Sequence, residues 1–222
     1  MTSSVLQTAI KAHDDFVVAH PEQFRLSVPL WRLLAKGKPV APEELASTSH
    51  RPLPEIQAFL HASDVRIDQA GHIIGQGLAF QPTRHQFHLD EKTLYTWCAL
   101  DTLAFPAVLG RAARVISTCP VTGKEIRLTV TPESFLDLEP ASAVVSVHLP
   151  GEDTDVCHIQ ADICNDGLFF ASREVASTWP SLHQSAILLS IEEAAQLGRA
   201  LASAFRSIAG EPEPERHGQY SI

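Results

Sequence analysis

The sequence predicts an α+β fold in which a helical N-terminal domain is followed by a mixed or antiparallel sheet with flanking helices. Two observations predict it. Short helical segments bounded by proline and glycine dominate the first 80 residues, and short alternating strands dominate the stretch from residue 81 to residue 190. Because the helices are segregated from the strands, no βαβ repeat is expected. We therefore expect domains at 1–80 and 81–210, with the charged, proline-rich segment 211–222 as a disordered tail.

Composition limits the class of protein. The chain has 222 residues, 45% of them hydrophobic, and a net charge of −9. An acidic chain is a poor partner for nucleic-acid phosphates. No apolar run has the length of a signal-peptide core or a membrane span, so we expect a cytoplasmic protein with no membrane partner. Its four cysteines are then expected to be reduced thiols, available for catalysis or ligation.

The N-terminal domain is predicted from local helix signals. We expect a lead-in helix over 1–25, helices over 28–37, 42–46 and 53–61, and two short strands around a glycine turn at 65–75. Three helices and a hairpin make a winged-helix-like unit. Such a unit can read DNA with its third helix, but this third helix contains no lysine or arginine. A scaffold packed on the second domain is the favoured interpretation.

The second domain is predicted as a series of strands that ends in one long helix. Strands are expected at 86–89, 114–119, 125–130 and 144–148, the second and third of these form a hairpin, and 187–190 is a further apolar run. Ser190 and Glu193 form a capping box that begins the last helix, and Gly210 ends it.

The central feature of the second domain is the stretch 94–106, which is expected to be a helix entered directly from the strand at 86–89. It carries Cys98 and Asp101, which are three residues apart and so share a helix face. Their neighbours are apolar or aromatic. A thiol and a carboxyl that face one another in a poorly hydrated place are costly to keep unless they do chemistry.

Cysteine spacing alone identifies no metal site. There is no Cys-x-x-Cys pair, and the P-loop, dinucleotide-binding, nucleophile-elbow and His-Glu-x-x-His motifs are absent. A lone cysteine usually only packs in the core. Cys98 differs because of the nearby carboxyl, and Cys164 because the polar loop 165–167 and aromatic residues follow it. A structural alternative stays open for Asp101, as the ion-pair partner of a nearby arginine such as Arg111 or Arg114.

The two cysteine segments carry a resemblance to a known family. The first is Leu94-Tyr-Thr-Trp-Cys98-Ala-Leu-Asp101-Thr-Leu-Ala-Phe-Pro, followed by Gly110-Arg-Ala-Ala-Arg-Val and Cys119. The second runs from Cys164 to Phe169-Phe170-Ala-Ser172. Together they resemble the alkylmercury lyase (organomercurial lyase) family, and the similarity extends from about residue 26 to residue 210.

The resemblance implies an enzyme of mercury detoxification that cleaves the carbon–mercury bond of organomercury cations, giving the hydrocarbon and Hg(II). By position it implies that Cys98 and Cys164 are the active thiols and that Asp101 handles the proton. These three side chains would also hold the Hg(II) product transiently. Cys119 matches a cysteine regarded as structural. In some members a second cysteine directly follows the later active thiol, whereas this chain has Asn165 there.

Partners follow from the same resemblance. No cofactor is expected, small thiols are expected to be needed for turnover, and a mercuric reductase is a candidate recipient of the product.

The chemistry is also reasonable from the residue types. Mercury is a soft ion that binds thiolate far better than oxygen ligands. One thiol would capture the organomercury cation, and the second would add electron density that makes the bound carbon easier to protonate. An ordinary aspartate is protonated only about one time in a thousand at neutral pH. We therefore expect burial to raise the pKa of Asp101, and we expect Asp101 to accept the Cys98 proton and return it to carbon.

Two other classes of protein stay open. A non-catalytic mercury binder or sensor would use Cys98 and Cys164 as a clamp and would release no hydrocarbon. A transcription regulator would need a basic recognition face, which the helix at 53–61 lacks.

Overall fold

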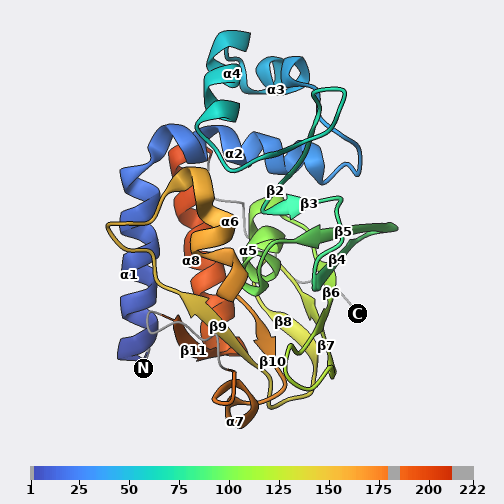
Figure 1. Cartoon of the computed structure of the whole chain (residues 1–222), viewed down its shortest axis with the longest axis vertical. Coiled ribbons are helices and arrows are strands. Elements are labelled where there is room, and N and C mark those ends of the chain that lie inside the picture. Colours follow the sequence, from blue (N-terminus) through green and yellow to red (C-terminus); the bar gives the residue numbers. More distant parts are fainter. Residues whose placement is uncertain (1–2, 180–185, 212–222) are drawn as a thin grey trace.

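The computed structural model describes residues 3–179 and 186–211 (Figure 1). The helices are α1 (Ser4–Ala19), α2 (Pro21–Leu34), α3 (Pro42–Ser49), α4 (Leu53–His61), α5 (Ala99–Leu109), α6 (Ile159–Asp162), α7 (Arg173–Ala176) and α8 (Ile191–Ala209), with 3-10 turns η1 (Val156–His158) and η2 (Cys164–Asp166). The strands are β1 (Arg66–Ile67), β2 (Ile73–Gln76), β3 (Leu78–Ala79), β4 (His85–Leu89), β5 (Lys92–Thr96), β6 (Ala113–Thr118), β7 (Glu125–Val130), β8 (Phe135–Glu139), β9 (Val144–His148), β10 (Phe169–Phe170) and β11 (Ala186–Ser190). The predicted α+β class is confirmed.

The strands form two antiparallel sheets. The larger has the order β1-β2-β3-β5-β4-β6-β7-β8, and the smaller has the order β10-β9-β11. Buried and exposed residues alternate along β6 and β7, as expected for strands with one face on the core. The larger sheet continues through β3 into β5, so the boundary expected at residue 80 lies inside one sheet and stays a prediction.

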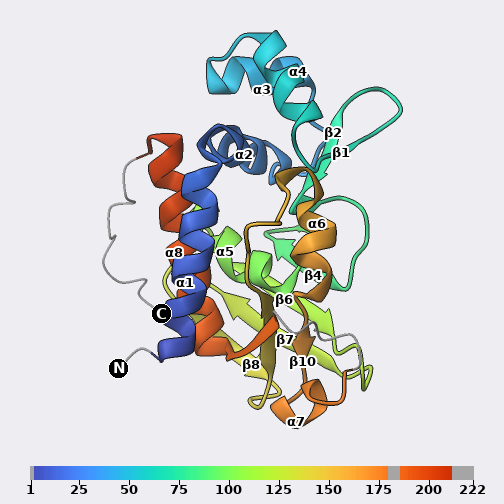
Figure 2. The ribbon, with the colours of Figure 1, turned by 60° about the vertical axis from the view of Figure 1, so that its left-hand side comes forward.

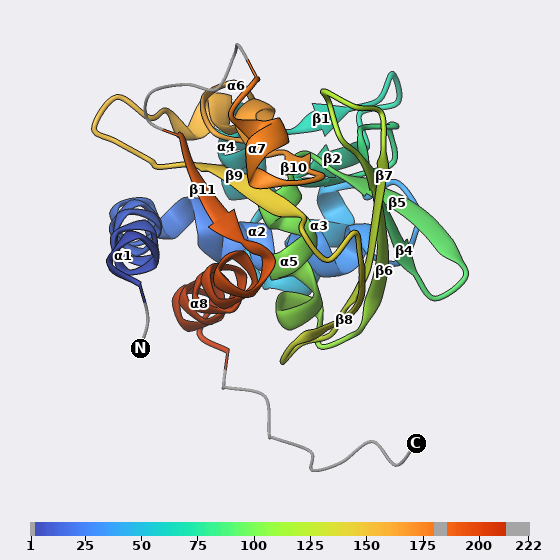
Figure 3. The ribbon, with the colours of Figure 1, turned by 90° about the horizontal axis from the view of Figure 1, so that it is seen from below.

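Helix α5 is the centre of the molecule. Figure 3 shows it between the larger sheet on one side and α8 with the smaller sheet on the other. Nearly all its side chains are buried, as expected for a helix that is apolar on every face. Gly198 of α8 allows the close contact with α5, because a Cβ at that position would lie 2.8 Å from the Leu103 carbonyl oxygen.

The N-terminal helices cover the top and one side of this core. Helix α1 runs beside α8 (Figure 2), α2 crosses above them, and α3 and α4 lie at the far end (Figure 1). The single lead-in helix expected over 1–25 is wrong: the chain breaks at His20, and Pro21 begins a second helix that runs to Leu34. Within the described ranges, no helix is long and apolar enough to cross a bilayer.

The helix expected over 94–106 is wrong at its start. Residues 92–96 form β5 instead and pair with β3 and β4, because threonine and tyrosine fit a half-buried strand. Helix α5 begins only at Ala99 and continues through Pro106 to Leu109, where Gly110 ends it with a φ of 67°. The strand at 86–89 therefore leads into β5 and only then into the helix.

Helix α8 begins and ends where the sequence predicts. Ser190 and Glu193 form the expected capping box of α8, and Gly210 ends the helix in the left-handed conformation. The predicted tail at 211–222 lies outside the described residues, except for Glu211.

Candidate active site

Cys98 and Asp101 face one another through the cap of α5. Cys98 is the residue just before the helix, in extended backbone conformation. The Asp101 N–H donates to Cys98 Sγ at 3.4 Å, and the Cys98 N–H donates to Asp101 Oδ2 at 3.2 Å. This is a capping box with a thiol in the place usually taken by a serine or threonine hydroxyl. The sulfur therefore lies at the positive end of the helix dipole, which favours negative charge there.

Cys164 reaches the same point from the turn η2. The turn rests on the start of α5, where the Ala99 N–H donates to the Gly167 carbonyl at 2.7 Å. Gly167 allows this contact, because a Cβ there would lie 2.7 Å from Cys98 Cβ and 3.3 Å from Cys98 Sγ. A larger residue would push the two cysteines apart.

Strand β9 fixes the position of the η2 turn through hydrogen bonds of Ser146. The Ser146 hydroxyl donates to the Asp166 carbonyl and accepts from the Leu168 N–H at 3.0 Å. The position of Cys164 is thus set by a buried hydroxyl of the smaller sheet.

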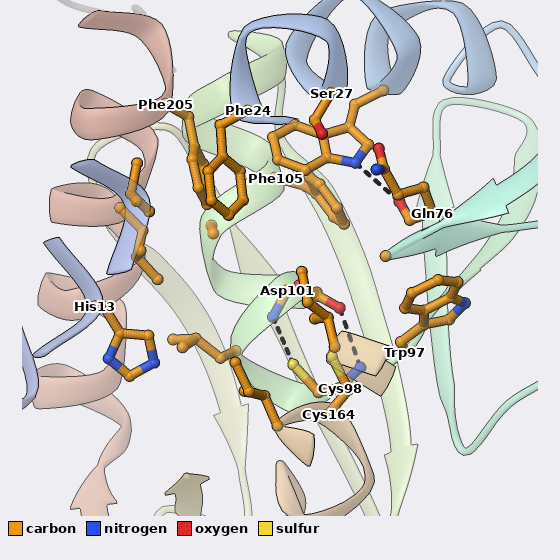
Figure 4. A pocket seen from close by; sticks show the side chains of 18 of the residues that line it. His13, Phe24, Ser27, Gln76, Trp97, Cys98, Asp101, Phe105, Cys164 and Phe205 are labelled. Atoms are coloured by element: carbon orange, nitrogen blue, oxygen red, sulfur yellow. Dashed lines mark hydrogen bonds between the residues drawn. The ribbon is translucent and has the colours of Figure 1, made fainter. Parts of the chain in front are cut away.

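The fold brings the predicted residues together. Cys98 Sγ, Cys164 Sγ and a carboxylate oxygen of Asp101 all lie within 4.8 Å of one another (Figure 4). Cys98 and Cys164 are each 4% exposed, and Asp101 is half-buried. Their catalytic roles stay predictions. Of the two arginines considered as ion-pair partners of Asp101, Arg111 pairs with Asp90 instead.

Burial sets the protonation states of the three groups. It raises the pKa of Asp101 from 3.8 to about 6, against the hydrogen bonds from Cys98. For Cys98, the hydrogen bond from Cys164 lowers the thiol pKa, but burial and the Asp101 charge outweigh it and the net pKa is raised. The pKa of Cys164 is raised well above its usual value by its hydrogen bond to Cys98 and by burial. Both thiols are therefore protonated at neutral pH, and Asp101 takes up a proton far more readily than an ordinary aspartate.

An apolar cavity of about 100 Å³ opens beside the three groups. Aromatic rings form much of its wall (Figure 4): Trp31 packs edge-on against Phe105 and Phe205 at centroid distances of 5.2 and 5.0 Å, and Phe24 stacks on Phe205 at 5.1 Å. Elements α1, α2, α5, α6 and α8 all contribute to its lining. A small hydrocarbon group fits such a wall.

The other two cysteines lie apart from this cluster. Cys119 is buried where β6 ends, and Cys157 is partly exposed in η1, where its thiol donates to the Ala62 carbonyl at 3.2 Å. All four cysteines are free thiols.

Sequence reasoning missed the residues that build the surroundings of the site. The sequence indicated Gly167 only as part of the polar loop 165–167, with no role in the spacing of the cysteines. Gly77 was not singled out, although its carbonyl accepts from the Trp97 N–H at 2.8 Å and its φ is 65°. His13 and Gln76 line the cavity. For His13 a signal existed, since it follows the buried Leu6 and Ala9 at helical spacing.

Comparisons with known proteins agree with this geometry. A family model described as alkylmercury lyase matches residues 78–203, and one described as the helix-turn-helix domain of alkylmercury lyase matches residues 18–77. The chain belongs to the alkylmercury lyase family. The resemblance seen in the two cysteine segments is thereby confirmed.

Individual relatives are similar over most of their length. Proteins named alkylmercury lyase are 40% identical in Staphylococcus epidermidis (80% of this chain, 81% of that one), 44% in Streptomyces lividans (79% and 81%) and 43% in Pseudomonas putida (82% and 86%). The crystal structure of the mercury-bound form of MerB2 has a TM-score of 0.74 at 22% identity, covering 89% of this chain and 99% of that one. At that identity the likeness concerns the fold.

Proposed function

We propose that this member of the family is an organomercurial lyase, which cleaves the carbon–mercury bond of organomercury cations to give the hydrocarbon and Hg(II). One observation carries the proposal: two buried thiols and a carboxyl converge within 4.8 Å at the wall of an apolar cavity. Thiolates suit the soft metal, and the cavity suits its organic group.

Capture begins with protonated thiols. When the Cys98 sulfur bonds to mercury, its proton must leave, and the carboxylate of Asp101 is the nearest base in the cluster. Asp101 becomes a neutral carboxylic acid, the form that burial already favours. The Cys164 sulfur then bonds to the same mercury. Its proton leaves with the small thiolate on which the organomercury cation arrives, or with solvent.

Cleavage returns one proton to carbon. The electron pair of the carbon–mercury bond takes the proton of Asp101, so a C–H bond forms as the C–Hg bond breaks. Hg(II) stays bound to the two thiolates, and the regenerated carboxylate is a third, weaker ligand. General acid catalysis of this kind contributes typically about 10²- to 10⁴-fold.

Turnover requires removal of the product. Incoming small thiolates exchange with the two cysteine sulfurs and carry Hg(II) away, and direct transfer to a mercuric reductase is the other route. We propose that the reaction needs no cofactor. Because it consumes reduced thiols, we assign it to the cytoplasm.

The experiment is hydrocarbon release under turnover. Purified protein is incubated with excess small thiol and phenylmercury or methylmercury, and benzene or methane is measured by gas chromatography. Cys98→Ser and Cys164→Ser should release none. Cys157→Ser is the matched control, since its thiol lies outside the cluster, and it should behave like the native chain. Mercury retention without hydrocarbon from the native chain would favour the second candidate, a non-catalytic mercury binder.

A further inference from the structure

The cavity contains polar atoms that a plain hydrocarbon group would leave unpaired. Within the described part of the chain, His13 Nε2, Gln23 Nε2 and Gln76 Oε1 are buried without a hydrogen-bond partner, and all three residues line this cavity. These residues are only 5, 8 and 7% exposed. Buried polar groups are normally paired, because an unpaired one keeps its full desolvation cost. Three such atoms around one cavity point to a ligand that pairs with them.

Gln76 is tied to the site through its backbone and through the residue that follows it. Its carbonyl accepts from the Trp31 indole N–H at 2.8 Å, which holds its backbone at the end of β2. The next residue, Gly77, borders the site directly, since a Cβ built there would lie 3.7 Å from Asp101 Oδ2. Figure 4 shows the Gln76 side chain across the cavity from Cys98 and Asp101. An organic group on mercury at the thiols would have to cross the cavity to reach it.

The hydrogen-bonding role of His13 follows from its other ring nitrogen. Nδ1 lies 2.9 Å from the Ala9 carbonyl oxygen, which can only accept, so Nδ1 carries the hydrogen. Burial lowers the pKa of His13 to about 4, so the ring is neutral at pH 7 and Nε2 is an acceptor. Among the unpaired buried atoms of the cavity, His13 Nε2 and Gln76 Oε1 are thus acceptors, and the Gln23 amide nitrogen is a donor.

The charged residues that line the cavity limit which chemical groups it can bind. No lysine or arginine is among the described residues that line the cavity, whereas Asp64 and Asp101 are. A carboxylate on the organic group would be repelled, and an ammonium would have to lose its water in an apolar space. A hydroxyl is uncharged and can both donate to an acceptor and accept from the amide.

We propose that the cavity is a subsite for organic groups that carry a terminal hydroxyl, with Gln76 as the main hydrogen-bond acceptor and Gln23 and His13 as further contacts. The inference rests on the proposed function and narrows its substrate class to hydroxyalkyl-mercury cations alongside simple alkyl ones.

The test compares two substrates of equal length, 3-hydroxypropylmercury and n-butylmercury, which differ by a hydroxyl in place of a methyl group. Two quantities are measured for each: kcat/KM for release of propanol or butane, and the share of organomercury retained by the protein against a competing small thiol. The native chain should favour the hydroxyl substrate roughly tenfold, the usual effect of satisfying one buried group. Gln76→Met keeps the side-chain length and should abolish or reverse this preference.

The controls separate the possible failures. Gln86→Met changes a half-buried glutamine in β4 outside the cavity and should keep the native preference. Gln23→Met is tested beside Gln76→Met. The inference is overturned if the native chain has equal kcat/KM and equal retention for the two substrates, or if both variants keep the native preference. Buried water would then be the partner of these polar atoms. If neither product forms, the proposed function fails, and the retention ratio still decides on the hydroxyl subsite.

Discussion

Replacing Gly167 by alanine tests how the two active thiols are brought together. The new Cβ would lie 2.7 Å from Cys98 Cβ and 3.3 Å from Cys98 Sγ, closer than side-chain carbons approach one another. The turn that carries Cys164 must therefore move away from α5, which also stretches the 2.7 Å hydrogen bond from Ala99 to residue 167. Overpacking of this kind costs about 1–3 kcal/mol of stability. A misplacement of about 1 Å in a reacting group costs on the order of 10²-fold in rate.

Gly167→Ala should accordingly release hydrocarbon about 10- to 100-fold more slowly than the native chain. Gas chromatography of benzene from phenylmercury gives the rate, and thermal unfolding gives the stability. Gly151→Ala is the matched control, because a Cβ at that position meets nothing within 4 Å and its φ needs no glycine. A Gly167→Ala variant with native rate and native melting temperature would refute the argument that this glycine sets the spacing of the thiols.

Three further outcomes are expected. Because burial raises the pKa of Asp101 from 3.8 to about 6, the ionised carboxylate destabilises the fold above pH 6. Asp101→Asn should raise the free energy of unfolding by about 1–2 kcal/mol at pH 7.5, and this gain should disappear as the pH falls from 6 to 4. Urea unfolding at pH 7.5 and at pH 4 measures the difference between the variant and the native chain. A variant less stable than the native chain at pH 7.5 would contradict the prediction. Since the proposed route passes the Cys98 proton to the Asp101 carboxylate during capture, kcat/KM of the native enzyme should rise as pH increases through about 6, and a flat profile would speak against Asp101 as the usual proton acceptor. Gly198→Ala should lower the melting temperature by several degrees, because its Cβ would meet the α5 backbone at 2.8 Å; an unchanged value would show that α8 can shift freely.

The sequence was informative where a local signal decides the structure. The capping box at Ser190, the glycine turn in the β1–β2 hairpin and the alternation in β6 and β7 each specify their own conformation, and each is found. The class of the fold followed from such elements. The two cysteine segments also sufficed to identify the family.

Long-range pairing decided the parts that the sequence did not predict. The residues 92–96 have a pattern that suits either a helix or a strand, and their pairing with β3 and β4 makes them a strand. Cys98 and Asp101 were expected to meet on a helix face, but they meet across a helix cap, which depends on where α5 begins. Cys98 and Cys164 are 66 positions apart in the sequence, and no local signal between them indicates their contact. The cavity likewise draws its lining from segments far apart in the sequence.

The most direct test of the account is a single turnover without added thiol. Native protein in excess is mixed with phenylmercury, and benzene is measured by gas chromatography. Native mass spectrometry then gives the mass of the protein together with whatever it has bound. The account predicts one benzene per phenylmercury and a protein that has gained mercury without the phenyl group. Asp101→Asn should instead gain mercury with the phenyl group still attached. Phenylmercury retained intact by the native protein would contradict the claim that the two thiols and Asp101 cleave the carbon–mercury bond.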